Sequence, residues 1–290
     1  MKIIGYWLLL FFPAAAIAQP GSEIYLFDMT VINNKIIVSH PVNITQHKGY
    51  DSQPFFHSGQ PLIYYASFND SGRSDIKVYN YSTQQTTNLT VTHEREYSPT
   101  LTPDKKFISC IIQRDNGAQD LGKYPVKGGE PIVLINNLVV GYHAWIDKNR
   151  LLLFVLDDSV SNSLHDYDLL TKEDKIIAKN AGRSLHTIPG KPAMSFVQKI
   201  NKKEATIERF NTKSLTVSTI TKALPGQEDL VWTKTGLIIM SDGEKLYSYQ
   251  PGTNAGWQQI IISGDTSMLK GVTRLALNKA NTKLAVVVSE

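Results

Sequence analysis

Cysteine is almost absent from this chain of 290 residues, which contains a single one, Cys110. One cysteine cannot form an internal disulfide, and it excludes a CxxC metal or redox site. Cys110 lies in the apolar segment FISCII, residues 107–112, where a thiol serves as a small buried hydrophobic group. The fold therefore has to form without covalent cross-links.

Sharp catalytic motifs are also missing. No GxSxG segment is present, which argues against a peptidase of the prolyl-oligopeptidase type. The segment HEREY, residues 93–97, begins like a zinc motif but ends on tyrosine instead of histidine. KGGE, residues 127–130, is typical of a hairpin turn and lacks the helix that phosphate binding requires. No recognised motif requires a cofactor, so whether the protein uses one is unknown from the sequence. No catalytic residue is assigned.

Neither sign of charge dominates. The chain has 30 lysine and arginine residues against 26 aspartate and glutamate residues, a formal net charge of +4. The basic residues are scattered along the chain, so they offer no positive stripe to a nucleic acid. We therefore expect no nucleic-acid partner.

A long apolar run occurs only at the N-terminus. Residues 3–17 are nearly all apolar, a lysine precedes them, and AIA at 16–18 fits the small-x-small rule for signal cleavage. The alternative is a membrane anchor, but the run is shorter than the roughly 20 residues needed to span a bilayer. We predict a signal peptide over residues 1–18 and a mature protein that begins near Gln19. That protein is expected to be periplasmic or secreted and not to span the membrane.

What the sequence does contain is a repeat. Six segments in which a polar loop leads into a short apolar strand recur every 42 to 45 residues. Repeats of roughly 40 to 45 residues made only of strands are typical of propeller blades. The residues at the equivalent position of each repeat, called the anchors below, are Phe56, Leu101, Trp145, Thr187, Trp232 and Leu277.

Within one repeat, alternating hydrophobicity and turn residues predict a meander of four strands. In the first full repeat, residues 61–68, 75–81 and 86–91 have strand character, and the turn NDSGRS separates the first two. Helical periodicity is absent. We therefore predict an all-β, six-bladed propeller of four-stranded antiparallel blades, forming a single domain over residues 19–290.

Closure of the ring requires strands from both ends of the chain. The segment after Leu277, NKANTKLAVVVSE, is too short to complete a four-stranded blade. Two spare strands, residues 23–29 and 35–45, are available near the N-terminus. Placing them on the outside of the last blade leaves no open sheet edge. We therefore predict that these N-terminal strands join the C-terminal blade.

Three segments carry a resemblance to a known family. TPDKKFISC (102–110), SDIKVYNYSTQQTTNLT (74–90) and YDSQPFFHSGQPLIYYAS (50–67) resemble the repeats of TolB-like, WD40-like bacterial β-propellers. The resemblance implies a six-bladed periplasmic propeller whose central channel engages protein partners of the cell envelope. TolB itself carries an α/β domain before its propeller, whereas the repeats of this chain begin almost at the predicted cleavage site. An identical role is therefore not implied.

Loops that cross from an outer strand to the next inner strand usually carry the binding residues of a propeller. Histidines are enriched in these loops, and His143 and His186 each fall within two residues of an anchor. Imidazole binds divalent metals, so these two are metal candidates, with Asp51 or Glu96 completing a site. The candidate ligand- or partner-binding residues are His47, Asp51, His93, Glu96, Tyr97, Tyr142, His143, Arg183, His186 and Glu228.

The same residues also have a structural interpretation, because loops between blades need polar side chains to satisfy backbone groups. Trp145 and Trp232 are expected to pack between blades. The preferred function is a non-catalytic binding or scaffold protein. Such a protein engages a protein segment or a small ligand on its loop-rich face or in its channel. The alternative is a metal-assisted lyase or hydrolase that acts on a glycan or lactone at the channel mouth.

Overall fold

The computed structural model describes residues 21–69, 71–157 and 161–290. Within these residues the chain forms 25 β-strands. In the same part of the chain, no helix has the length and apolar character needed to cross a membrane. The predicted signal peptide lies outside the described residues.

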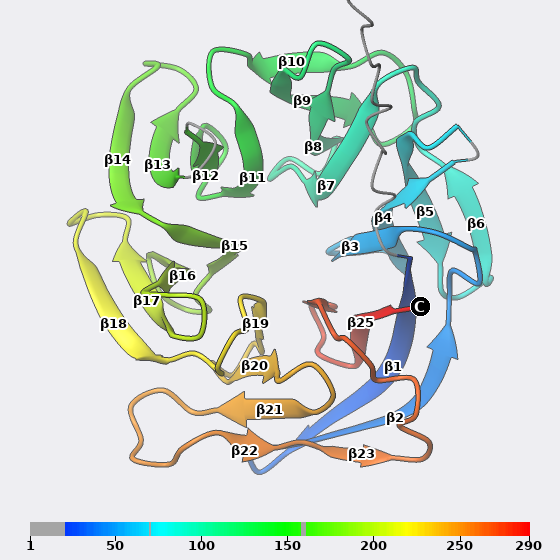
Figure 1. Cartoon of the computed structure of the whole chain (residues 1–290), viewed down its shortest axis with the longest axis vertical. Helices are drawn as coiled ribbons and strands as arrows, with labels where there is room; N and C mark the ends of the chain where they lie inside the picture. The colour runs from blue at the N-terminus through cyan, green and yellow to red at the C-terminus, as the bar shows by residue number, and fades with distance from the viewer. Residues whose placement is uncertain (1–20, 70, 158–160) are drawn as a thin grey trace, which may run out of the picture.

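The strands form six sheets arranged as blades around a central axis (Figure 1). Blade 1 contains β3 (Asp51–Phe56), β4 (Leu62–Phe68), β5 (Ser74–Asn80) and β6 (Gln85–Asn88). Blade 2 contains β7 (Arg95–Leu101), β8 (Phe107–Gln113), β9 (Gln119–Pro125) and β10 (Ile132–Ile135). Blade 3 contains β11 (Val140–Trp145), β12 (Arg150–Leu156), β13 (Asn162–Asp168) and β14 (Asp174–Lys179).

The next two blades repeat this plan. Blade 4 contains β15 (Ala181–Thr187), β16 (Ala193–Lys199), β17 (Ala205–Asn211) and β18 (Val217–Lys222). Blade 5 contains β19 (Leu230–Trp232), β20 (Ile238–Ser241), β21 (Leu246–Tyr249) and β22 (Gln258–Gln259). In each of these five blades the strands pair antiparallel in chain order, as the sequence predicts for a meander.

Blade 6 closes the ring with strands from both ends of the chain. Its order is β23-β2-β1-β25-β24, and β1 pairs antiparallel with β25, so that Ser22 lies opposite Ser289. Figure 1 shows the blue N-terminal strands beside red β25. The predicted closure is therefore confirmed. The strands of this blade are β23 (Ile261–Ser263), β2 (Lys35–Asn43), β1 (Ser22–Ile32), β25 (Lys283–Ser289) and β24 (Arg274–Leu277).

Blade 6 also holds a fifth strand that the sequence analysis did not predict. β23 pairs with β2 in parallel, with Ile37 opposite Ile261, which makes this sheet mixed. Without β23, the outer edge of β2 would expose its backbone donors and acceptors. The chain that leaves blade 5 through β22 continues along this edge and covers it (Figure 1).

The anchors have a common place in the fold. Each of the six is the last residue of the innermost strand of its blade, namely β3, β7, β11, β15, β19 and β24. The first residues of these strands therefore gather at one end of the central channel and the anchors at the other. The repeat in the sequence thus corresponds to one blade per period.

The hydrophobic core is divided into six clusters, each between two neighbouring blades. Phe27 of blade 6 and Leu246 of blade 5 belong to one such cluster. Cys110 is fully buried in the cluster between blades 1 and 2, as expected. Trp145 packs between blades 2 and 3, and its indole Nε1 donates a hydrogen bond to Ser109 Oγ at 2.9 Å. These clusters hold each innermost strand in place around the channel.

Candidate functional site

Bulges in the innermost strands shape the central channel. The pairing register shifts between Ser52 and Phe55 in β3 and between Tyr97 and Thr100 in β7. Each bulge contains a residue with positive φ, 58° at Gln53 and 55° at Ser98. Gln53 Oε1 accepts a hydrogen bond from Ser98 N at 2.7 Å, which links the two bulges. Bulges redirect side chains near functional sites, and Gln53 lines the channel.

One side chain from each blade faces the channel at an equivalent position, three or four residues before the anchor. These six residues, called the channel ring, are Ser52, Tyr97, Tyr142, Arg183, Asp229 and Arg274. The ring therefore combines two tyrosines, two arginines, one serine and one aspartate.

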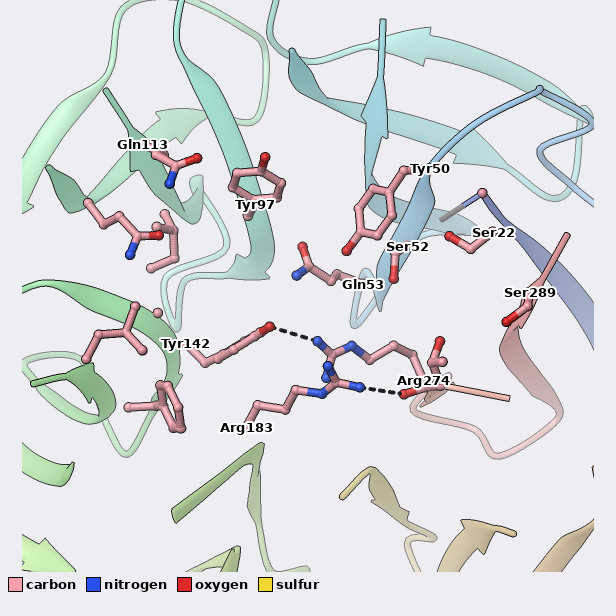
Figure 2. A pocket seen from close by; sticks show the side chains of 17 residues that line it. Ser22, Tyr50, Ser52, Gln53, Tyr97, Gln113, Tyr142, Arg183, Arg274 and Ser289 are labelled. Carbon is pink, nitrogen blue, oxygen red and sulfur yellow. Dashed lines mark hydrogen bonds between the residues drawn. The ribbon is translucent and has the colours of Figure 1, made fainter. Parts of the chain in front are cut away.

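Three cavities lie in series along the axis. The mouth, about 640 Å³, is lined by five members of the ring together with Tyr50, Gln53 and Gln113 (Figure 2). The waist, about 110 Å³, shares Tyr142 with the mouth. The far chamber, about 510 Å³, shares His143 with the waist and lies at the anchor end. The mouth is within the size range of pockets that bind small ligands or short chain segments.

Arg274 is fixed across the ring by two blades. Its Nη1 lies 3.3 Å from Asp229 Oδ2, and its Nη2 donates to Tyr142 Oη at 2.9 Å (Figure 2). Its guanidinium carbon is 5.1 Å from the centre of the Tyr142 ring, within cation–π range. Burial alone lowers the pKa of Arg274, but Tyr142 and Asp229 raise it above its usual value. Arg274 is therefore a fixed, charged group in the channel.

Arg183 lies beside Arg274 (Figure 2). Its Nη2 donates to the carbonyl oxygen of Thr273 at 3.4 Å. Burial raises the pKa of Tyr142, but the positive charges of Arg274 and Arg183 outweigh burial and lower it. The two guanidinium groups thus create a positive field over the Tyr142 hydroxyl.

The two histidines predicted as metal candidates both line the waist. His143 Nε2 lies 2.7 Å from Ser109 Oγ, and burial lowers its pKa to about 3. His186 Nε2 lies 3.0 Å from Ser184 Oγ, and burial lowers its pKa as well, although Asp229 opposes the shift. Burial therefore favours the neutral form of both rings. In the described part of the chain, no group of three or more His, Cys, Asp or Glu residues is placed to hold a metal ion.

The two predicted carboxylates do not line the three channel cavities. Glu96 is fully buried and accepts hydrogen bonds from Thr92 Oγ1 at 2.6 Å and Tyr124 Oη at 2.9 Å. Asp51 is also fully buried, and its Oδ2 is 3.4 Å from His47 Nδ1. These residues belong to the packing of blades 1 and 2.

The remaining predicted residues divide between the mouth and the surface. Tyr97, Tyr142 and Arg183 line the mouth. His93 is exposed in the loop between β6 and β7. Glu228 forms an ion pair with Lys199 at 2.6 Å and lines a separate cavity of about 440 Å³. The structure therefore brings together three of the candidates at the mouth and the two histidines just below them.

Sequence reasoning missed Arg274, Ser52 and Gln53. Arg274 begins β24 and lies outside the loops between blades, whereas Ser52 and Gln53 lie beside the predicted Asp51 but carry no ionisable group. The sequence repeat could have identified Ser52 and Arg274, because all six residues of the channel ring lie three or four residues before an anchor.

Comparisons with known proteins identify the fold. No protein-family model matches the sequence, and no curated protein is significantly similar to it. A putative TolB from Agrobacterium tumefaciens has a TM-score of 0.70 at 13% identity, over 94% of this chain and 99% of that chain. TolB from Acinetobacter baumannii has a TM-score of 0.57 at 13% identity, over 93% of this chain. This chain has a TolB-like propeller fold.

The matches differ in how much of the other protein they cover. This chain spans 64% of the length of the Acinetobacter TolB. An oligogalacturonate lyase in complex with manganese matches with a TM-score of 0.53 at 14% identity, over 94% of this chain and 99% of that chain. At these identities the TolB-like fold is established, and function has to be argued from the site.

Proposed function

We propose that this protein is an exported, non-catalytic binding propeller that holds a segment of a partner protein of the cell envelope in the mouth of its channel. The observation that carries the proposal is the mouth itself, a cavity of about 640 Å³ lined by side chains of the channel ring. The predicted signal peptide and the TolB-like fold support a role in the envelope.

The chemistry of the mouth suits binding. Tyrosine and arginine are enriched in binding hot spots. The mouth contains Tyr50, Tyr97, Tyr142 and both arginines of the channel ring. Gln113 adds an amide that can pair with the backbone of a bound segment. The innermost strands are fixed by hydrogen bonds to their neighbours, so little conformational entropy is lost when a ligand binds.

The alternative is a metal-assisted lyase or hydrolase that acts on a glycan or lactone. One observation favours it: His143 and His186 both line the waist, and burial favours the neutral form that metal ligands need. However, neither of the acidic ligands proposed for it, Asp51 or Glu96, lines the waist, and Glu96 is bonded to Thr92 and Tyr124. Titration of the purified protein with manganese decides the point. Stoichiometric binding that is lost in a double His143→Ala, His186→Ala variant would favour the enzyme over the binding protein.

Site-specific photo-cross-linking tests the binding function directly. A benzophenone amino acid replaces Tyr97 in the mouth, and in a control variant it replaces Leu170, which is 72% exposed on the turn between β13 and β14. Irradiation of native cells is expected to give a discrete protein adduct from the mouth position only. Equal adducts from both positions, or none from the mouth, would contradict the proposal.

A further inference from the structure

The mouth carries more positive charge than its own residues neutralise. Arg183 and Arg274 both line it, and none of its described lining residues is aspartate or glutamate. Asp229, the carboxylate of the channel ring, lies deeper, in the waist. It pairs with Arg274 through Oδ2 at 3.3 Å, and its Oδ1 accepts a hydrogen bond from Leu275 N at 2.8 Å. Among the described residues of the ring, one of the two guanidinium charges is therefore left over.

Arg183 is the group that is not neutralised. Its hydrogen bond to the Thr273 carbonyl is long, at 3.4 Å, and therefore weak. Its Nε atom is buried and has no hydrogen-bond partner in the described part of the chain. Arg183 donates to the carbonyl oxygen of Thr273, the residue directly before Arg274. The two guanidinium groups lie next to each other (Figure 2). Adjacent like charges repel, and a charged donor without an acceptor destabilises the site further.

A bound anion would remove both sources of instability. A carboxylate is planar and accepts parallel hydrogen bonds from the donor fork of arginine. It carries one negative charge, which matches the single unneutralised guanidinium. Tyr50, Tyr97 and the apolar side chain of Ile111 also line the mouth and can contact the groups that flank a carboxylate.

We propose that the mouth is a carboxylate-binding site in which Arg183 and Arg274 hold an acidic group of the bound protein segment. This inference rests on the proposed function and specifies which segment is recognised. The segment presents one carboxylate, either from an aspartate or glutamate side chain or from a C-terminus. Arg183 supplies the free charge, and Asp229 and Tyr142 keep Arg274 in position.

Selection from a displayed random heptapeptide library provides the test. The probes are the library and synthetic copies of the enriched peptides. The wild-type protein is expected to enrich peptides with one aspartate or glutamate at a common position. Arg183→Gln is expected to bind them about 10-fold to 100-fold more weakly, because it loses a hydrogen bond to a charged group. The control Arg209→Gln removes an exposed arginine of β17 that lies outside the mouth, and it should bind as the wild type does.

Two further arms identify the source of the carboxylate and protect the test against misfolding. Synthetic peptides that end in a free carboxylate or in an amide separate C-terminal from side-chain recognition. Binding that survives removal of both carboxylates overturns the inference. Arg183→Lys keeps the charge but loses the fork, so intermediate affinity is expected. Circular dichroism melting of each variant confirms that it is folded.

The outcomes separate the inference from the proposed function. Enrichment of acidic peptides that Arg183→Gln abolishes supports both. Enrichment of peptides without an acidic residue, or equal binding by Arg183→Gln, overturns the carboxylate site but leaves a segment-binding propeller. Failure to enrich any peptide contradicts segment binding and the carboxylate site together. Displacement of the enriched peptides by inorganic phosphate as readily as by acetate would show a general anion site and would also overturn the inference.

Discussion

Asp51 provides a sharp test of the electrostatics of the ring closure. Its side chain is fully buried beside the N-terminal strands, and its two carboxylate oxygens have no hydrogen-bond partner in the described part of the chain. The nearest charged group is His47, whose Nδ1 lies 3.4 Å from Oδ2 without hydrogen-bond alignment. Burial raises the pKa of Asp51 from 3.8 to about 6, partly opposed by the nearby Ser67 hydroxyl, His47 and Lys77 and reinforced by Glu23.

The magnitude and sign follow from this shift. The pKa of Asp51 is 3.8 in the unfolded chain and about 6 in the folded protein. This difference means that folding disfavours the ionised form relative to the protonated form by about 3 kcal/mol. Because the folded-state value is the higher one, Asp51 contributes its full stabilisation below its unfolded pKa of 3.8. The contribution is lost as the pH rises through about 6, where the buried group ionises. Asp51→Asn cannot ionise, so we expect it to be more stable than the wild type by up to about 3 kcal/mol near neutral pH.

Urea unfolding followed by tryptophan fluorescence measures this difference. The free energy of unfolding of Asp51→Asn is compared with that of the wild type below pH 4 and above pH 7. The gain should be present only at the higher pH. Glu130→Gln, a carboxylate-to-amide change at an exposed turn residue, serves as the control and should leave the pH dependence unchanged. A loss of stability in Asp51→Asn at neutral pH would refute the reasoning, since it would mean that the ionised carboxylate is stabilised where it lies.

Three further predictions test other parts of the structure. Ser109→Ala removes the partner of both the Trp145 indole at 2.9 Å and His143 Nε2 at 2.7 Å, so the free energy of unfolding in urea should fall by about 2 kcal/mol; an unchanged value would contradict these bonds. Burial raises the pKa of the Cys110 thiol well above its usual value, so a thiol reagent should react with it only in urea. Rapid labelling of the native protein would show that this core opens. Mass spectrometry of the exported protein should find Gln19 at the N-terminus, whereas an intact leader would contradict cleavage.

The fold was predictable because its signals are local and repeat six times. Each blade brings its own alternating strands and turn residues, so an error in one repeat is corrected by the others. The anchors Phe56 and Trp232, for example, lie at equivalent strand ends although their surroundings differ. The fifth strand of blade 6 was not predictable in this way. β23 pairs with the exposed edge of β2, and that edge lies beside residues 261–263 only once the N-terminal strands have joined the last blade.

The site was only partly predictable, because the direction of a side chain depends on bulges and long-range contacts. Tyr97, Tyr142 and Arg183 were predicted as residues of the loops between blades, and they lie near the beginning of β7, β11 and β15. Asp51 lies in the same part of its repeat but faces the interior of the protein, because its neighbour Ser52 occupies the channel position. The bond between His143 and Ser109 joins two blades and leaves no trace in the spacing of residues.

The pairing of β1 with β25 has a consequence for the timing of assembly. Residues about 260 positions apart must meet before the last blade exists, at an entropic cost of about 5 kcal/mol for a flexible chain of that length. Arg274 lies in β24 of this closing blade, and Ser52 lies in β3 of the neighbouring blade 1. A chain whose last strand has not yet been made therefore has no complete central channel, and the side chains that line the mouth are brought together only when β25 pairs with β1.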